Sequence, residues 1–397
     1  MKGADLFRRN FAKAASPGAV GGLGLIPAHC HPHLVDSRLD GALQGSTRFE
    51  RVTLLSIPII LPMNVFELTR ALVDVESITL NEERVGEVLY AHLSDLAVRY
   101  QGHVERIEVE PRRFNLYAHW GDPVVTLSTH IDTVPPFFPS REDEQNIWGR
   151  GACDTKGIIA AMIFAVRELL EAGHRNIAFL FVVGEERNSA GAFHAAQHPR
   201  GSRFLINGEP TENKLALGSK GALRLELVAS GRMAHSAYPE LGESAIDKLL
   251  DALDHVRRLP LPTDKILGAS TLNIGTISGG RAPNVIADEA RAEVFIRLVD
   301  DGNATCEAVK QAIGGIVDLR EVLAVPAVHL GSLPGFETIV VAYTTDIPAF
   351  GGAWGEPYLL GPGSIHVAHT NNEYVPKAQL LEAIQIYKRM ILQLTKN

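Results

Sequence analysis

The stretch that decides the fold is Val124 to Asp132, which reads VVTLSTHID. A short apolar run of this kind is typical of a buried strand, and here it ends in a histidine and an aspartate. Two later runs repeat the pattern: Ile177 to Val183 leads into Gly184-Glu185-Glu186, and Arg203 to Asn207 leads into Gly208-Glu209. Because open α/β sheets bind ligands at the carboxyl ends of their strands, we expect these side chains to meet at one edge of a sheet.

Two further segments supply candidates of the same kind. A fourth run, Phe336 to Tyr343, leads toward a glycine-rich loop that holds His366 and His369. Asp154 lies in GRGACDTKG, ahead of the apolar helical segment Lys156 to Ala172. Each feature alone has an ordinary reading, since Asp is also favoured as a helix cap. The full set at successive strand ends indicates a catalytic metal centre, although spacing alone does not decide between the two histidines.

The chemistry of these side chains favours two metal ions. His130 and Asp132 are two residues apart, so a strand places both on one face. We predict that His130 binds metal while Asp132 accepts the other ring N–H and fixes the tautomer. Glu185 and Glu186 repel each other as neighbours, and a cation would relieve that repulsion while the second carboxylate faces the reacting water.

Two imidazoles and three carboxylates, one of them bridging from Asp154, fit paired Zn²⁺ ions, with Co²⁺ or Mn²⁺ as alternatives. Such a pair would acidify a shared water and polarise a carbonyl. The sequence therefore predicts two divalent metal ions per subunit.

Composition excludes several classes of protein. The chain has 397 residues, enough for two or more domains, with 46% apolar and 21% charged residues. A net charge of −8 with no basic run argues against a nucleic-acid partner. Three scattered cysteines favour a reducing, cytoplasmic compartment. The apolar stretch Ile57 to Met63 is too short to cross a membrane.

The first 62 residues keep no sustained helical or strand period. We interpret residues 1–62 as a disordered or over-long N-terminus. The alternative is export, because Arg8-Arg9 followed by a weakly apolar stretch resembles a twin-arginine signal.

Helices and strands alternate from residue 63 to 217, which implies a mostly parallel sheet. Residues 218–330 differ: four alternating strands and two helices predict a small α+β domain with an antiparallel sheet. Candidate ligands lie on both sides of it, at Glu209 and His369. We therefore predict an α/β catalytic domain, residues 63–217 and 331–397, with an inserted dimerisation or lid domain at 218–330.

From residue 63 onward the chain resembles the M20 metallopeptidase family, which includes acetylornithine deacetylase, succinyl-diaminopimelate desuccinylase, aminoacylase and glutamate carboxypeptidase. The motifs that carry the resemblance are STHIDTVP, GRGACDTKG, GEE, GEPT, GRMAHSAYP and the late Ala-His loop. The family places its last ligand after an alanine, which selects His369 over His366.

The resemblance implies a role for each matching residue. Asp154 bridges the ions, and the remaining ligands are His130 and Glu209 for one metal and Glu186 and His369 for the other. Glu185 is the general base, and the peptide bond after Asp154 is cis. The remaining residues implied to act on the substrate are His235, offered to the partner subunit's oxyanion, Asn284 and Arg297 for the substrate carboxylate, and Gly363.

These features predict a metal-dependent amide hydrolase that removes an N-acyl group from an amino acid and works as a homodimer, without nucleic-acid or membrane partners. The alternative activity is a dipeptidase or carboxypeptidase acting on short peptides. A non-catalytic metal- or peptide-binding homologue would have lost Glu185 or a ligand, and this chain keeps them all.

Overall fold

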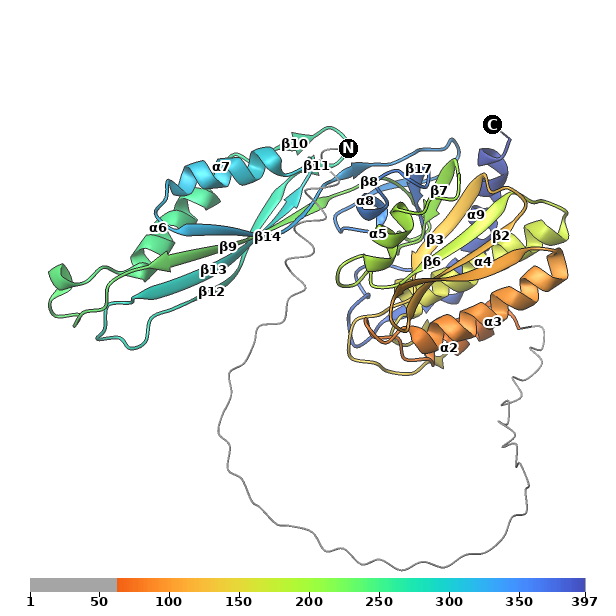
Figure 1. Ribbon diagram of the computed structural model, residues 1–397, viewed down its shortest axis with the longest axis horizontal. Coiled ribbons are helices and arrows are strands. Elements are labelled where there is room, and N and C mark those ends of the chain that lie inside the picture. The colour runs from red at the N-terminus through yellow and green to blue at the C-terminus, as the bar shows by residue number, and fades with distance from the viewer. Residues whose placement is uncertain (1–62, 397) are drawn as a thin grey trace, which may run out of the picture.

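The structure is a computed structural model that describes residues 63–396. The expectations for the N-terminal 62 residues lie outside the described part. Figure 1 shows two lobes, a broad one with helices on a twisted sheet and a narrow one that extends away from it.

The broad lobe is built on a six-stranded sheet of order β1-β2-β6-β3-β7-β17. Strands β6, β3, β7 and β17 run parallel, while β1 and β2 are antiparallel at one edge. The sheet is therefore mixed, with the predicted parallel part at its centre. Its strands are β1 (His103–Glu110), β2 (Arg113–Trp120), β3 (Val125–His130), β6 (Ile177–Val182), β7 (Phe204–Asn207) and β17 (Glu356–Leu359).

Helices cover both faces of this sheet, which explains why its central strands are apolar without alternation. In β6, Phe179 and Phe181 pack into the larger core, whereas Leu180 and Val182 pack into the smaller core on the opposite face. On the larger-core side lie α2 (Val65–Val73), α3 (Glu83–Tyr100), α4 (Gly157–Glu171) and α9 (Lys377–Leu394). On the other side lie α5 (Ala190–Ala196) and α8 (Ile347–Phe350).

The narrow lobe, called the insert below, spans residues 221–325. Its antiparallel sheet has the order β12-β13-β9-β14 and buries one face under two helices (Figure 1). The alternating burial of β13, as in Val294 and Ile296, matches the alternation in the sequence. Its main elements are β9 (Gly221–Ser230), α6 (Ala245–Arg257), β12 (Thr271–Gly279), β13 (Glu289–Leu298), α7 (Asn303–Ile313) and β14 (Asp318–Val325).

Short elements complete the fold. The expected insert boundaries at 218 and 330 fall at a three-stranded sheet of order β15-β8-β16 that joins the lobes. These strands are β8 (Leu215–Ser219), β15 (Val328–His329) and β16 (Thr338–Val341). The others are β4 (Arg141–Glu142), β5 (Asn146–Trp148), β18 (Tyr374–Pro376), β10 (Thr263–Asp264), β11 (Gly268–Ala269) and the single turns Ala152–Lys156 and Pro239–Leu241.

One expected strand forms, but its expected place beside the other ligand-bearing strands was wrong. The run Phe336 to Tyr343 yields β16, which pairs with β8 outside the central sheet. The strand that adjoins β7 and precedes the last loop is β17, whose four residues include Pro357 and give little apolar signal. Within residues 63–396, no helix combines the length and apolar character needed to cross a membrane.

Candidate metal centre

Three neighbouring parallel strands deliver the candidate ligands to one edge of the sheet. His130 is the last residue of β3, Glu185 and Glu186 follow β6, and Glu209 follows β7. Since β3 pairs with both β6 and β7, their carboxyl ends lie side by side. Asp154 enters from the turn ahead of α4. These residues therefore converge at one edge of the sheet, as the sequence predicts.

The ligand atoms form two groups that share Asp154. His130, Asp154 and Glu209 make one group and Asp154, Glu186 and His369 the other, with the ligand atoms of each group all within 4.8 Å of one another. Asp154 Oδ1 lies 3.0 Å from His130 Nε2, and Oδ2 lies 3.3 Å from His369 Nε2. The two oxygens of Asp154 thus face different groups, which is the arrangement that a bridging carboxylate needs.

The acids of this cluster, Asp154, Glu185, Glu186 and Glu209, outnumber its two histidines, His130 and His369. Glu209 is 4% exposed, and its Oε1 is buried without a hydrogen-bond partner. Burial, followed by neighbouring carboxylates, raises the pKa of Glu185 and Glu186. Burial also raises the pKa of Glu209, although His130 acts against the rise. Divalent cations would satisfy the orphaned oxygen and offset the repulsion, so the residues present fit a pair of divalent ions.

Asp132 organises the turn that carries the glutamates. Its Oδ1 accepts hydrogen bonds from Gly184 N at 3.0 Å and Glu185 N at 3.1 Å, and Oδ2 accepts from Glu186 N at 3.3 Å. The nearest acceptor for His130 Nδ1 is the Asp132 backbone carbonyl at 3.0 Å, while its carboxylate Oδ1 lies 3.5 Å away. The residue therefore orients His130 mainly through its backbone, and the side chain chiefly holds the Gly-Glu-Glu turn.

The loop around Asp154 is fixed on both sides. Thr155 Oγ1 donates to the His130 carbonyl at 2.6 Å, and the backbone N–H groups of Cys153 and Asp154 donate to Glu373 Oε1, each at 3.1 Å. The Asp154–Thr155 peptide is cis, as the resemblance predicted. Burial disfavours the charge on Asp154, but hydrogen bonds with His130 and His369 outweigh it and lower the pKa.

The structure also decides between His366 and His369 as the candidate ligand. His369 Nε2 lies 3.0 Å from Glu186 Oε2, and its bonds to Asp154 and Glu186 raise its pKa to about 10. His366 is exposed and belongs to neither group. Gly363, predicted to contact substrate, packs against Cys153, and its N–H donates to Gln379 Oε1 at 2.7 Å.

A pocket of 410 Å³ opens over the metal-ligand cluster at the junction of the lobes, lined by Glu185, Glu186 and His369 among others. The insert contributes Arg297 to its wall, from β13. The Arg297 guanidinium stacks on Phe295, and burial lowers its pKa. Among residues 63–396, no carboxylate forms an ion pair with it. One predicted substrate-binding residue therefore does reach the site within its own chain.

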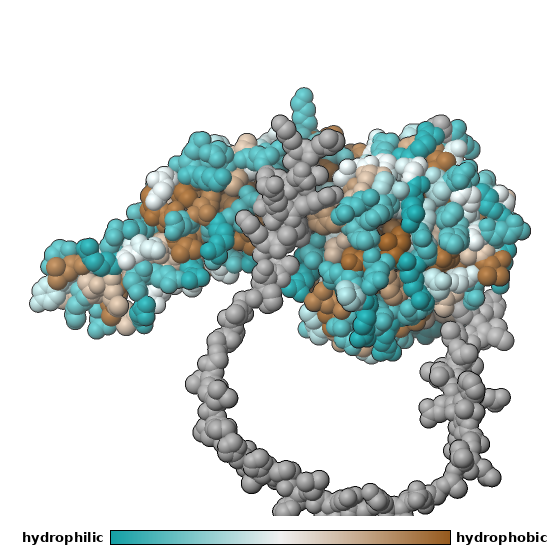
Figure 2. Space-filling view, viewed as in Figure 1, coloured by the Kyte–Doolittle hydropathy of each residue, from teal (hydrophilic) through white to brown (hydrophobic). Residues whose placement is uncertain are grey.

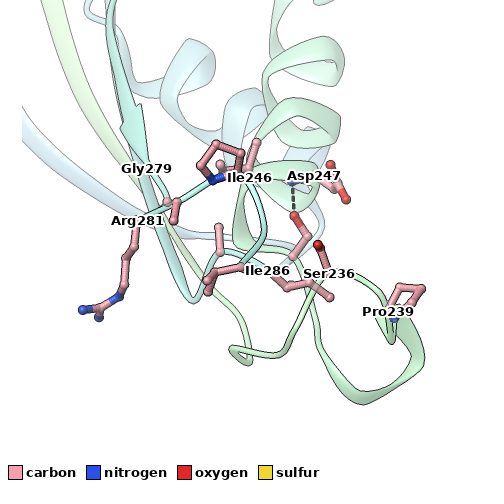
Figure 3. A pocket seen from close by; sticks show the side chains of 13 residues that line it. Ser236, Pro239, Ile246, Asp247, Gly279, Arg281 and Ile286 are labelled. Carbon is pink, nitrogen blue, oxygen red and sulfur yellow. Dashed lines mark hydrogen bonds between the residues drawn. The ribbon is translucent and has the colours of Figure 1, made fainter.

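The other two insert residues lie apart from this pocket. His235 and Asn284 occupy facing loops, joined by a bridge between His235 and Val285, and both are exposed. A separate pocket of 720 Å³ lies between these loops and the start of α6. Figure 3 shows Ile246 and Ile286 in it, with the Arg281 side chain directed away. Neither His235 nor Asn284 lines the pocket over the metal-ligand cluster of its own chain.

Several buried or charged residues of this region received no role from the sequence. Glu373 and Arg150 are each 1% exposed and form an ion pair beside Asp154. Asp346 is also 1% exposed, and burial raises its pKa to about 7. Arg187, which follows Glu186 in the sequence, lines the pocket over the metal-ligand cluster. Isolated acids outside an apolar run give no pattern from which their position could be predicted.

Known proteins resemble this chain along most of its length. The family model described as "Peptidase family M20/M25/M40" matches residues 126–393. A peptidase M20 domain-containing protein of Schizosaccharomyces pombe is 40% identical over 359 residues, 86% of this chain and 88% of the relative. A probable carboxypeptidase of Aspergillus flavus is 38% identical over 368 residues, 81% of this chain and 88% of its own length.

Solved structures share the fold. Aminopeptidase PepT from Bacillus cereus superposes with a TM-score of 0.71 at 20% identity, covering 83% of this chain and 98% of that one. A dinuclear metal binding peptidase of the M20 family from Bacillus subtilis gives a TM-score of 0.61 at 15% identity, with coverage of 83% and 98%. The chain belongs to the peptidase family M20/M25/M40. It is a metallohydrolase that acts on peptide bonds.

Proposed function

We propose that the protein is a di-metal hydrolase of carboxypeptidase type, which cleaves the amide bond next to a free α-carboxylate in a short peptide or an N-acyl amino acid. The observation that carries the proposal is Arg297, whose guanidinium lines the same pocket as the metal-ligand cluster and has no carboxylate partner within residues 63–396. Arg binds a carboxylate through two parallel hydrogen bonds, which fixes both distance and orientation. The names of the curated relatives, probable carboxypeptidases, support the same choice.

His130, Asp154, Glu186, Glu209 and His369 would hold the ions. Two divalent ions, when bound, supply Lewis-acid chemistry: they lower the pKa of water and polarise the scissile carbonyl. Glu185 lines the pocket but belongs to neither ligand group, so its carboxylate is free to handle protons. Glu185 takes the proton of the attacking water and delivers it to the leaving nitrogen. Burial favours the protonated form that this second step requires, since it raises the pKa of Glu185.

We also propose a homodimer in which His235 and Asn284 serve the partner's pocket. Both residues are exposed and remote from the cluster of their own chain. Strand β12 lies at the edge of the insert sheet, and an exposed edge is a ready template for a second chain. Apolar side chains are exposed beside it, namely Ile277 (57%) on β12 and Leu250 (51%) on α6. Figure 2 shows hydrophobic residues along this narrow lobe.

The decisive experiment compares matched substrates on protein loaded with Zn²⁺, Co²⁺ or Mn²⁺. A panel of dipeptides and N-acetyl amino acids is assayed beside the same compounds carrying a C-terminal amide. Cleavage of the free acids with little turnover of the amides is expected. Equal cleavage of both, or release of residues from the amino end of C-terminally blocked peptides, would overturn the proposal. The ratio of peptide to N-acetyl turnover then separates a carboxypeptidase from a deacetylase.

A further inference from the structure

Glu373 connects two loops that carry candidate metal ligands. It lies four residues after His369, immediately before β18, and is 1% exposed. Its Oε1 accepts the N–H groups of both Cys153 and Asp154, at 3.1 Å each. Its Oε2 pairs with Arg150 Nη1 at 2.5 Å. All three of these hydrogen bonds are directed at one loop, 149–154.

These contacts restrain the residue on which both ligand groups depend. Asp154 is common to both groups, so its carboxylate must aim one oxygen at each. The Glu373 bond holds the backbone N–H of Asp154, and the Thr155 hydroxyl holds the following residue to the His130 carbonyl. A shift of the loop would move both oxygens together, because they belong to one side chain.

We propose that Glu373 is a positioning residue for the metal centre: its carboxylate locks the Asp154 loop and ties it to the His369 loop, so that both ions are held. The inference rests on the proposed di-metal site. A positioning residue differs from a purely structural ion pair in one respect. A structural pair stabilises the fold, whereas a positioning residue also sets the affinity for metal. Groups that orient metal ligands in this way typically change metal affinity about 10–100-fold when removed.

The test must avoid leaving Arg150 as an unpaired buried charge, since that alone could unfold the protein. Two double variants solve this. In Arg150→Gln/Glu373→Gln the pair becomes neutral and the amide oxygen at 373 still accepts the two N–H groups. In Arg150→Gln/Glu373→Met the volume is similar but the acceptor is gone. The two variants differ only in the bonds that the proposal invokes.

Leu89→Ala is the control for lost stability. Leu89 is fully buried in the same core, on α3, a helix that packs mainly against β1, β2 and α4. Its truncation leaves a cavity in the core, so it should lower the denaturant concentration at the unfolding midpoint and leave metal binding unchanged. Metal affinity is measured for each apo-protein by competition with a chromophoric chelator for Zn²⁺, and stoichiometry by elemental analysis.

The glutamine pair should bind two ions within about threefold of the wild type, and the methionine pair about 10–100-fold more weakly at both sites. Equal affinities in the two pairs would overturn the inference, as would weaker binding of one ion only, because Asp154 serves both. A loss of affinity in Leu89→Ala matching that of the methionine pair would reduce Glu373 to a structural role. Wild-type protein that binds no ions would instead refute the di-metal site itself.

Discussion

Replacing Asp132 with Asn tests whether the turn bearing the two glutamates is held by charge. The carboxylate is fully buried and accepts four hydrogen bonds, from Gly184, Glu185 and Glu186 N–H groups and from Thr79 Oγ1 at 2.8 Å. An amide nitrogen fits best at the Oδ2 position, where the Thr79 hydroxyl can rotate and accept. One bond, the longest at 3.3 Å to Glu186, is then lost.

One lost bond and two weakened ones, at about 1 kcal/mol each, should lower the unfolding free energy of the apo-protein by about 2–3 kcal/mol. Metal affinity should fall about tenfold, at the low end of the usual effect. The reason is that the Asp132 backbone carbonyl, 3.0 Å from His130 Nδ1, still fixes the tautomer of His130.

Denaturant unfolding of apo-protein and chelator competition for Zn²⁺ measure the two quantities, with Thr79→Val as the control. That variant removes one hydroxyl from the same carboxylate and should change stability by less than about 1.5 kcal/mol with metal affinity intact. An Asp132→Asn protein with wild-type affinity and stability would refute this account of the turn. Complete loss of metal would show that the carboxylate, and not the backbone, orients His130.

Three other predictions concern catalysis. Glu185→Gln should retain both ions by elemental analysis while kcat falls about 10²–10⁴-fold; loss of metal would make Glu185 a ligand. Arg297→Met should lower kcat/KM about 10–100-fold on substrates with a free α-carboxylate, given about 1.5–3 kcal/mol for a charged hydrogen bond, and leave slow turnover of C-terminal amides unchanged; an equal loss on both would exclude carboxylate recognition. Homodimers of His235→Ala and homodimers of Glu185→Gln should each be inactive. Mixed dimers of the two variants should regain up to half of normal activity, because one of their two sites then carries neither lesion. Demonstrated subunit exchange without activity would place His235 within its own site or outside catalysis.

Strong local patterns made most of the architecture predictable. The apolar runs before His130 and Glu185 are β3 and β6. The alternating strands of the insert were equally readable because one face of that sheet is buried. Strand β17 was missed because it is too short and too broken by Pro357 to show a period.

The candidate site was predictable as far as its residues sit at strand ends. What the sequence could not supply is contact across long separations. Glu373 accepts a hydrogen bond from the backbone of Asp154, 219 positions earlier, and the sequence around Glu373 does not predict that partner. The placement of Arg297 in the pocket and of His235 outside it likewise depends on how β13 and the loop at 231–243 lie in the insert. The oligomeric state, and with it the role of His235, stays a prediction.

The position of β17 has a consequence for how the protein is made. Residues 221–325 form one continuous stretch, so the insert leaves the ribosome with every strand of its sheet and both of its helices. The broad lobe cannot close at that moment, because β17 and α9, which complete its sheet and its larger core, are translated last. Since domains fold as units during synthesis, the insert is the first lobe of the described chain that can fold. The metal ligands that precede it can be completed only when His369 has been translated.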